Sequence, residues 1–349
     1  MIPVRRGEEP EELRNERYWR AARAMVQHHR GIKPAKEQLT GYKHARERLL
    51  SAQNNKCAYC EASVREGAPV EHFRPKDVYF WLTWSWDNLF IACSTCNDPK
   101  HKGAEFELFD PSSRLSPGQL PPGDEQPKLL DPSDPTVQPV RHIEFKVVAG
   151  RWLPVARAGN LRGDATVRAF GLDVGPIVDH YESHIENLRP RINDVRAAIA
   201  SGNPRAVSLA WDKLIGNAFS RRQQFHGLMY DVIASEIPEG IRAMWGLVLP
   251  EPGNNLPPDP PVQDRRVAAH EDLPERIVLE VRALGSRPGA VERDEVIAIL
   301  CAHRPHTCAE LAAILEREED YLLRVLQALH AAGRLVFTQP HYHTPSAQP

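Results

Sequence analysis

The sequence lacks a long apolar run and has little net charge. No stretch of 18 apolar residues occurs in its 349 residues, so we expect no transmembrane helix. The first twenty residues, MIPVRRGEEPEELRNERYWR, contain no apolar core of a secretory signal, and we therefore expect a cytoplasmic protein. The 44 Lys and Arg residues nearly balance the 46 Asp and Glu residues, which excludes a uniformly basic nucleic-acid coat.

The sequence also lacks a phosphate-binding loop of the form GxxxxGK[ST], so this chain is not expected to hydrolyse ATP. It has only six cysteines, which a reducing compartment would keep as thiols. The content of 42% hydrophobic and 26% charged residues is typical of a globular protein, and the length suggests two or three domains.

The charges are unevenly distributed along the chain. Residues 1–56 contain 13 Lys or Arg against 7 Asp or Glu, whereas residues 57–109 contain 5 against 8. A basic segment can steer a polyanion towards its neighbour, because phosphate attraction dominates non-specific nucleic-acid affinity. A solvated helix face would give the same composition, so both interpretations remain open.

Two proline-rich stretches divide the chain, since proline has a fixed φ and no N–H to donate. Residues 111–139 are interpreted as a long loop within a domain, and residues 250–261 as part of a linker. The predicted organisation is an N-terminal helical, locally basic segment (1–56), a metal finger (57–109), a scaffold of loop, hairpin and helices (110–249), a linker (250–272) and a C-terminal module (273–349).

The remaining pattern is mostly helical, which gives an α+β fold class dominated by helices. Apolar residues recur at three- and four-residue steps between Ile177 and Ile199, as on the buried face of a helix that Pro190 should kink. Further helices are expected at residues 11–28, 37–53 and 204–234, and a short hairpin at residues 142–148 and 151–155.

The segment with the clearest chemistry begins at Cys57 and contains two CxxC pairs. Cys57 and Cys60 form the first pair, and Cys93 and Cys96 form the second. Two such pairs in a reducing compartment predict a structural zinc ion held by four thiolates. Four unrelated buried cysteines or a redox pair are the alternatives.

Polar residues lie between and directly after these pairs. Glu71 and His72 are adjacent, Asn88 follows, and Asn97 comes directly after Cys96. A zinc ion with four sulfur ligands has no open position, so a second site is expected. Oxygen ligands suit Mg²⁺ or Mn²⁺, and an imidazole with a pKa near 6.5 can deprotonate water at neutral pH.

The pattern CxxC…EH…N…CxxCN…K resembles the HNH nucleases and their ββα-metal finger. The longer string VEHFRPK…WDNLFIACSTCNxxK is similar to the PtuB-like HNH endonucleases of Septu-type anti-phage systems and related retron-linked effectors. The resemblance extends over about residues 30–200. It implies a finger whose structural zinc is held by four cysteines, embedded in a helical domain.

The resemblance also implies a role for each matching residue. His72 matches the general base, Glu71 the acidic ligand of a catalytic Mg²⁺ or Mn²⁺, and Asn97 a further ligand on the finger helix. Asn88 matches the asparagine that orients the catalytic loop. Lys100 or Lys102 is expected to contact the phosphate, and the spacing does not choose between them.

Residues 291–345 predict a winged helix. Thr307 is the expected N-cap of a helix over 308–315, a second helix covers 321–332 and ends at Gly333, and a hairpin turns at Pro340. Acidic residues surround the start of the second helix, where a DNA-binding winged helix needs basic side chains. This favours contact with a protein over contact with DNA.

The function that we expect is metal-dependent cleavage of nucleic acid, with DNA the favoured substrate. The resemblance implies an effector subunit of a defence complex whose partner is a separate PtuA-like ATPase. Two alternatives remain: a zinc-stabilised winged-helix DNA-binding regulator without catalysis, and an RNA-directed HNH nuclease.

Overall fold

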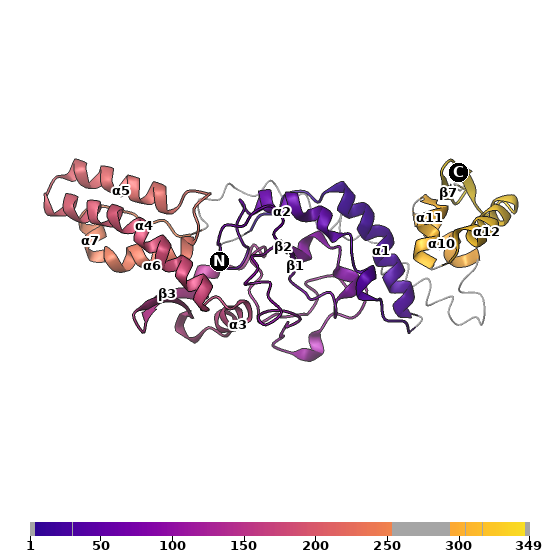
Figure 1. The fold of residues 1–349 in the computed structure, drawn as a ribbon, viewed down its shortest axis with the longest axis horizontal. Coiled ribbons are helices and arrows are strands. Elements are labelled where there is room, and N and C mark those ends of the chain that lie inside the picture. Colours follow the sequence, from indigo (N-terminus) through magenta and orange to yellow (C-terminus); the bar gives the residue numbers. More distant parts are fainter. Residues whose placement is uncertain (1–3, 30, 253–293, 304, 316, 346–349) are drawn as a thin grey trace.

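Figure 1 shows a computed structural model that describes residues 4–29, 31–252, 294–303, 305–315 and 317–345. Within these ranges helices dominate, and three small antiparallel sheets accompany them. The first half of the chain contains α1 (Glu11–His29), α2 (Arg46–Ala52), β1 (Val70–His72), β2 (Leu89–Ile91), β3 (Ile143–Val148), β4 (Arg151–Ala156) and α3 (Leu161–Phe170). A helical lobe follows, with α4 (Gly175–Ala200), α5 (Pro204–Ala218), α6 (His226–Glu236) and α7 (Glu239–Met244). The C-terminal module contains α10 (Asp294–His303), β5 (His306–Thr307), α11 (Cys308–Leu315), α12 (Glu319–Ala331), β6 (Val336–Thr338) and β7 (His341–His343).

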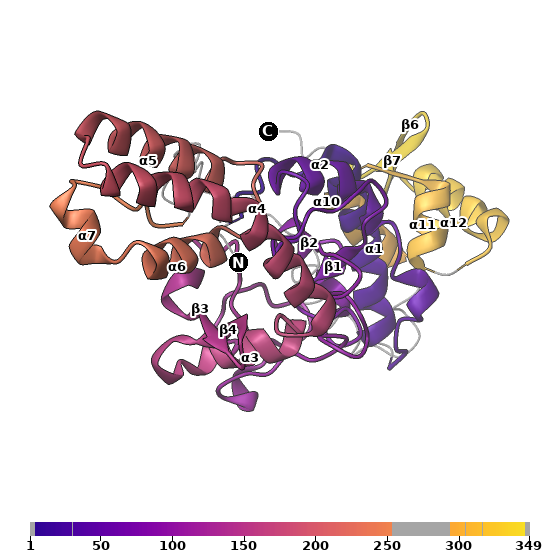
Figure 2. The ribbon, with the colours of Figure 1, turned by 60° about the vertical axis from the view of Figure 1, so that its left-hand side comes forward.

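One hydrophobic core runs from Val4 to Leu249, and a separate core runs from Val296 to Tyr342. The N-terminal segment, the finger and the scaffold predicted from the sequence therefore share a core. Helix α1 contacts both halves, because it packs against the first core and lies beside α11 of the C-terminal module (Figures 1 and 2). Among the described residues, no helix has the length and apolar content that crossing a membrane requires.

The β1–β2 hairpin lies at the centre of the first core. Its strands pair antiparallel with Val70 opposite Ile91 and His72 opposite Leu89, and all six residues are buried. Phe73, directly after β1, makes edge contacts with the rings of Phe90 and Phe106. The hairpin is thus enclosed on both faces, which fixes the direction of the side chains that leave it.

Three tryptophans between the strands belong to the core. Trp81, Trp84 and Trp86 are each at most 6% exposed. Their indole N–H groups donate to the backbone carbonyls of Gln119, Thr40 and Gly7, respectively. These bonds connect the loop of the finger to the N-terminal segment and to the proline-rich loop. The tryptophans therefore pack in the core and do not form a surface on which nucleic-acid bases could stack.

The prediction of one helix over residues 37–53 is wrong. Two short 3-10 turns, Lys36–Gln38 and Tyr42–Ala45, precede α2, which begins only at Arg46. Gly41 separates the turns with a φ of 91°, a left-handed conformation that ends a right-handed helix and that glycine adopts without steric cost.

The prediction of one helix over residues 204–234 is also wrong, because α5 ends at Ala218 and α6 begins at His226. Tertiary contacts hold the intervening turn on the segment that contains the first CxxC pair. Lys56 Nζ donates to the carbonyl of Gln223, and the backbone N–H of His226 donates to the buried Glu61 carboxylate. The predicted hairpin is confirmed as β3 and β4, and the long helix over residues 177–199 as α4.

No regular helix follows β2, although the resemblance implied a finger helix that carries Asn97. The segment forms consecutive turns instead. Proline restricts the residue before it, and the Asp98 side chain accepts a hydrogen bond from the backbone N–H of Lys100, which favours a turn after Asp98-Pro99. Gly103 closes the last turn, where a Cβ atom would lie 2.8 Å from the carbonyl oxygen of Pro99.

The C-terminal module forms the helices and the hairpin that the sequence predicts. Thr307 caps α11 as expected, since its hydroxyl accepts from the N–H of Glu310 and the Glu310 carboxylate accepts from the N–H of Thr307. Strand β5 pairs with β7, and β7 pairs with β6. Most of the predicted linker and residues 273–293 lie outside the described residues.

A buried ion pair anchors the proline-rich loop to the finger. Arg74 Nε lies 2.6 Å from Glu125 Oε2, and the two side chains are 7% and 0% exposed. The Tyr79 hydroxyl donates to the other carboxylate oxygen at 2.5 Å. A charge removed from water in this way depends on its counter-charge, because breaking a buried pair leaves the remaining charge without hydration.

We therefore expect Glu125→Gln to lower the free energy of unfolding by about 3–5 kcal/mol, since it leaves the Arg74 guanidinium buried without a counter-charge. Chemical denaturation measures the loss. Glu107→Gln serves as the control, because its ion pair with Lys128 is exposed and contributes at most about 1 kcal/mol. Equal losses in the two variants would contradict the anchoring role of Glu125.

Candidate functional site

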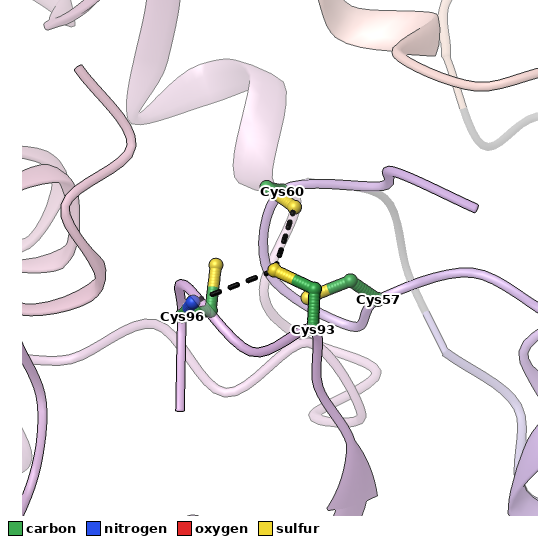
Figure 3. A group of neighbouring side chains, drawn as sticks. All are labelled: Cys57, Cys60, Cys93 and Cys96. Carbon is green, nitrogen blue, oxygen red and sulfur yellow. Dashed lines mark hydrogen bonds between the residues drawn. The ribbon is translucent and has the colours of Figure 1, made fainter. Parts of the chain in front are cut away.

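The four cysteines of the two CxxC pairs come together in one cluster. The sulfur atoms of Cys57, Cys60, Cys93 and Cys96 all lie within 4.8 Å of one another, and those of Cys60 and Cys93 are 3.7 Å apart (Figure 3). Four sulfurs at about 2.3 Å from a tetrahedral zinc ion would be about 3.8 Å apart. Both the donor chemistry and the spacing therefore fit a metal ion with four thiolate ligands.

The charges of these thiols also favour a cation. Hydrogen bonds from the other three sulfurs lower the pKa of Cys93, whereas hydrogen bonding within the cluster and burial raise the pKa of Cys60 and of Cys96. Without a cation, the cluster therefore holds one thiolate more readily than four. A divalent ion would stabilise all four as thiolates.

The cluster joins the start of the finger to the end of β2. The N–H of Ala58 donates to the carbonyl of Ile91, and the side-chain amide of Gln53 bonds both the N–H and the carbonyl of Ile91. Closing the segment in this way fixes the hairpin from which Glu71 and His72 project.

His72 is the last residue of β1 and is only 6% exposed. Its Nε2 atom lies 3.0 Å from the carbonyl oxygen of Thr83. Because a carbonyl can only accept, Nε2 carries the proton and Nδ1 keeps its lone pair. Burial lowers the pKa of His72 to about 3, since desolvation disfavours the imidazolium. The ring is therefore neutral at physiological pH, with Nδ1 as its basic atom.

Glu71 precedes His72 and forms an ion pair with Lys102. The Lys102 Nζ atom lies 2.6 Å from Glu71 Oε1 and donates to the backbone carbonyl of His72 at 2.7 Å. Burial raises the pKa of Glu71, and the ammonium of Lys102 opposes this by favouring the carboxylate. Lys102 is itself only 1% exposed, so it supports the site from within rather than facing a substrate.

Asn88 holds the backbone that follows His72. Its side-chain oxygen accepts from the N–H of Arg74 at 2.7 Å, and its side-chain nitrogen donates to the carbonyls of Arg74 and Leu82. Asn88 is 2% exposed and belongs to the 3-10 turn Trp86–Asn88 that leads into β2. It thus fixes the loop after β1 to the segment that contains Thr83.

Asn97 and Lys100 lie in the turns after β2. The N–H of Asn97 donates to the carbonyl of Cys93, and its side chain is half-buried. Over the described ranges, no hydrogen bond or ion pair joins the Asn97 side chain to Glu71 or His72. Lys100 is exposed. Of the two lysines that the spacing left open, Lys100 is therefore the one that solvent reaches.

Three residues beside His72 were missed by the sequence reasoning. Thr83 contributes through its backbone carbonyl, which no side-chain pattern reveals. The Tyr42 ring packs edge-on against His72 at a centroid distance of 4.5 Å, and Lys76 donates to the Tyr42 hydroxyl at 3.4 Å. Lys76 had a signal in the sequence, since it closes the string VEHFRPK.

Fewer side chains are available to bind a second metal ion than to bind an ion in the cysteine cluster. In the part of the chain that the structure describes, the four cysteines are the only group of three or more His, Cys, Asp or Glu side chains that could surround an ion. Glu71 offers one carboxylate and Asn97 one amide. Both are oxygen donors, the kind that Mg²⁺ takes alongside several waters and substrate phosphates.

The ion pair of Glu71 leads to a prediction about pH. In Lys102→Met the buried Glu71 loses its counter-charge, so its pKa should rise further above the ordinary value of 4.5. The folded state then holds this proton more strongly than the unfolded state does, and the stability falls as the pH rises from about 4.5. We expect Lys102→Met to lose about 3–5 kcal/mol near neutral pH and less at pH 5.

Denaturant unfolding of the zinc-loaded protein at several pH values measures this effect. The exposed Lys100→Met is the control and should follow the parent at every pH. A Lys102→Met variant with the pH dependence of the parent would contradict the pairing of Lys102 with Glu71.

Comparison with known proteins agrees with this site. The family model described as HNH endonuclease matches residues 57–103. The chain is 32% identical to the Septu protein PtuB of Bacillus mycoides (strain KBAB4) over 135 residues, covering 34% of this chain and 43% of that protein. It is 41% identical to the Septu protein PtuB of Bacillus thuringiensis over 69 residues, covering 18% and 27%, respectively.

The chain thus aligns with less than half the length of either relative, and no solved structure matches it. The matched residues begin at the first cysteine of the cluster and end at Gly103, so they enclose Glu71, His72 and both CxxC pairs. The resemblance expected from the sequence is confirmed for this part of the chain: residues 57–103 match the HNH endonuclease family, and part of the chain is similar to two proteins named Septu protein PtuB.

Proposed function

We propose that this protein is a metal-dependent HNH endonuclease that hydrolyses phosphodiester bonds of nucleic acid, with DNA as the favoured substrate. The observation that carries the proposal is the buried imidazole of His72, whose Nε2 donates to the Thr83 carbonyl and which directly follows the ion-paired Glu71 in β1. A buried structural histidine needs no such neighbour, whereas hydrolysis needs a base and a negatively charged cation ligand side by side.

His72 is the proposed general base, and Nδ1 is the atom that takes the proton from water. The hydrogen bond from Nε2 to Thr83 fixes the ring, and it also stabilises the imidazolium that forms when Nδ1 is protonated. Asn88 holds the following loop, so that the direction of the ring does not change during the reaction.

Glu71 and Asn97 are the proposed ligands of Mg²⁺ or Mn²⁺. When bound, such an ion stabilises negative charge on the phosphate oxygens and on the leaving group. The Lys102 ammonium keeps the buried Glu71 in the carboxylate form that a cation requires.

The cysteine cluster is the proposed site of a structural zinc ion. Four sulfur ligands leave no open position for water, so this ion would stabilise the fold and take no part in hydrolysis. Its contribution is to join Cys57 and Cys60 to the end of the hairpin that carries the catalytic residues.

The relatives named Septu protein PtuB support a role in anti-phage defence, and we propose a separate PtuA-like ATPase as the partner. The sequence contains no GxxxxGK[ST] loop of its own. We interpret the C-terminal module as a winged helix that contacts protein, because Glu318, Glu319 and Asp320 at the start of α12 would repel phosphates.

Two further functions would use the same features differently. A regulator that only binds DNA would not need the arrangement of Glu71, His72 and Lys102. Cleavage of RNA would need the same base and cation, and the substrates of the assay below distinguish it.

The test is cleavage of supercoiled plasmid, single-stranded DNA and total RNA by the purified protein, with Mn²⁺ or Mg²⁺. We expect His72→Gln to lower the rate by about 10²–10⁴-fold. Glutamine can still donate to the Thr83 carbonyl, so the loss would reflect the base rather than the fold. Lys43→Met, an exposed change close to the site, is the control.

A His72→Gln variant that cleaves as fast as the parent would exclude His72 as the base. Cleavage of RNA but of neither DNA substrate would identify RNA as the substrate in place of DNA. The absence of metal-dependent cleavage of all three substrates would favour the regulator.

For the cysteine cluster we expect one tightly bound zinc per chain, measured by elemental analysis. Cys93→Ser should lose this zinc and lower the thermal midpoint, because metal binding contributes to the folding free energy. Cys308→Ser is the matched control: Cys308 is a half-buried thiol in the separate C-terminal core, so the zinc content should not change. Full zinc content in Cys93→Ser would contradict the assignment.

A further inference from the structure

We propose that Lys76, held by Tyr42, is the residue that binds the substrate phosphate beside His72. This inference rests on the proposed function, because it concerns a nucleic-acid backbone at the same site. The sequence had directed attention to Lys100 and Lys102, which follow the second CxxC pair.

Lys76 is held close to His72 by Tyr42 and Leu39. Its Nζ atom donates to the Tyr42 hydroxyl at 3.4 Å and to the carbonyl of Leu39 at 3.3 Å. The same atom lies 4.9 Å from the centre of the Tyr42 ring, and that ring lies edge-on against His72. The ammonium is thus one aromatic ring away from the proposed base, and it is oriented before any ligand arrives.

The charge of Lys76 has no counter-charge in an ion pair among the described residues. Lys102 is paired with Glu71, and the neighbouring Asp77 is paired with Lys36 at 2.9 Å. No carboxylate within the ranges that the structure describes forms an ion pair with Lys76; its contacts there are to a phenol, a carbonyl and a ring. A half-buried ammonium with neutral partners keeps its attraction for an anion, and the protein around it reduces screening by water.

Accessibility separates Lys76 from the other two lysines. Lys102 is 1% exposed and already bonded, so a phosphate cannot reach it without opening the core. Lys100 is exposed, and an exposed side chain must lose conformational freedom to hold a ligand. Lys76 and Tyr42 are both half-buried, which leaves them open to solvent while they remain fixed.

The experiment measures binding without cleavage. The His72→Gln protein is titrated with a short DNA duplex over a series of NaCl concentrations, with no added divalent metal. Each phosphate contact contributes about 0.9 to the slope of log affinity against log salt. We expect Lys76→Met to lower this slope by about 0.9 and the affinity about tenfold.

Three matched variants complete the design. Lys76→Arg keeps the charge and should restore the slope. Lys43→Met removes the same charge from the exposed residue next to Tyr42 and should leave the slope unchanged. Tyr42→Phe removes the hydroxyl that orients Nζ and should weaken binding less than Lys76→Met does.

The proposal is overturned if Lys76→Met keeps the slope of the parent at an unchanged thermal midpoint, or if Lys100→Met lowers the slope and Lys76→Met does not. It is also overturned if the His72→Gln protein does not bind the duplex at low salt. These outcomes concern binding alone, so they are distinct from a failure of the parent to cleave, which would overturn the proposed hydrolysis.

Discussion

The closure of the segment between Cys57 and Cys96 is the constraint on which the proposed site depends. The four sulfurs converge from two turns that are far apart in the sequence, and the hairpin between them is enclosed by core side chains. Strands of three residues have few hydrogen bonds of their own and are marginal in isolation. The additional stability comes from the cysteine cluster, the Gln53 amide and the surrounding aromatic rings.

Burial has opposite consequences for the two adjacent residues at the end of β1. For His72, desolvation disfavours the imidazolium, so the ring is neutral. For Glu71, desolvation would retain the proton, and a buried ammonium is needed to keep the carboxylate. The structure therefore gives the two lysines near this site different tasks: Lys102 supports Glu71 from inside, and we infer that Lys76 faces the substrate.

The interior of the finger also connects the site to the rest of the chain. Arg74, two residues after His72, is bonded through its backbone to Asn88 and through its side chain to Glu125 of the proline-rich loop. The indole groups of Trp84 and Trp81 tie the same region to residues 40 and 119. The long loop and the N-terminal segment therefore act as supports of the candidate site rather than as appendages.

Local patterns in the sequence were sufficient for the CxxC pairs, the EH dipeptide, the α4 helix and the capped helix α11, since each depends on residues close together in the chain. They failed at residues 37–53 and 204–234, where a glycine in a left-handed conformation and contacts with Gln223 and His226 interrupt an apparently continuous pattern. The resemblance failed after β2, where turns replace the helix that it implied.

What the sequence alone determined about this protein is its chemistry: four thiols in two pairs, one imidazole beside one carboxylate, and no ATP-binding loop. Only the tertiary structure decided how these groups act on one another. The proton on Nε2 follows from a backbone carbonyl eleven residues away, and the pairing of Lys102 with Glu71 follows from burial in the core. Neither can be predicted from the spacing of residues, because both arise from contacts between segments that are distant in the sequence.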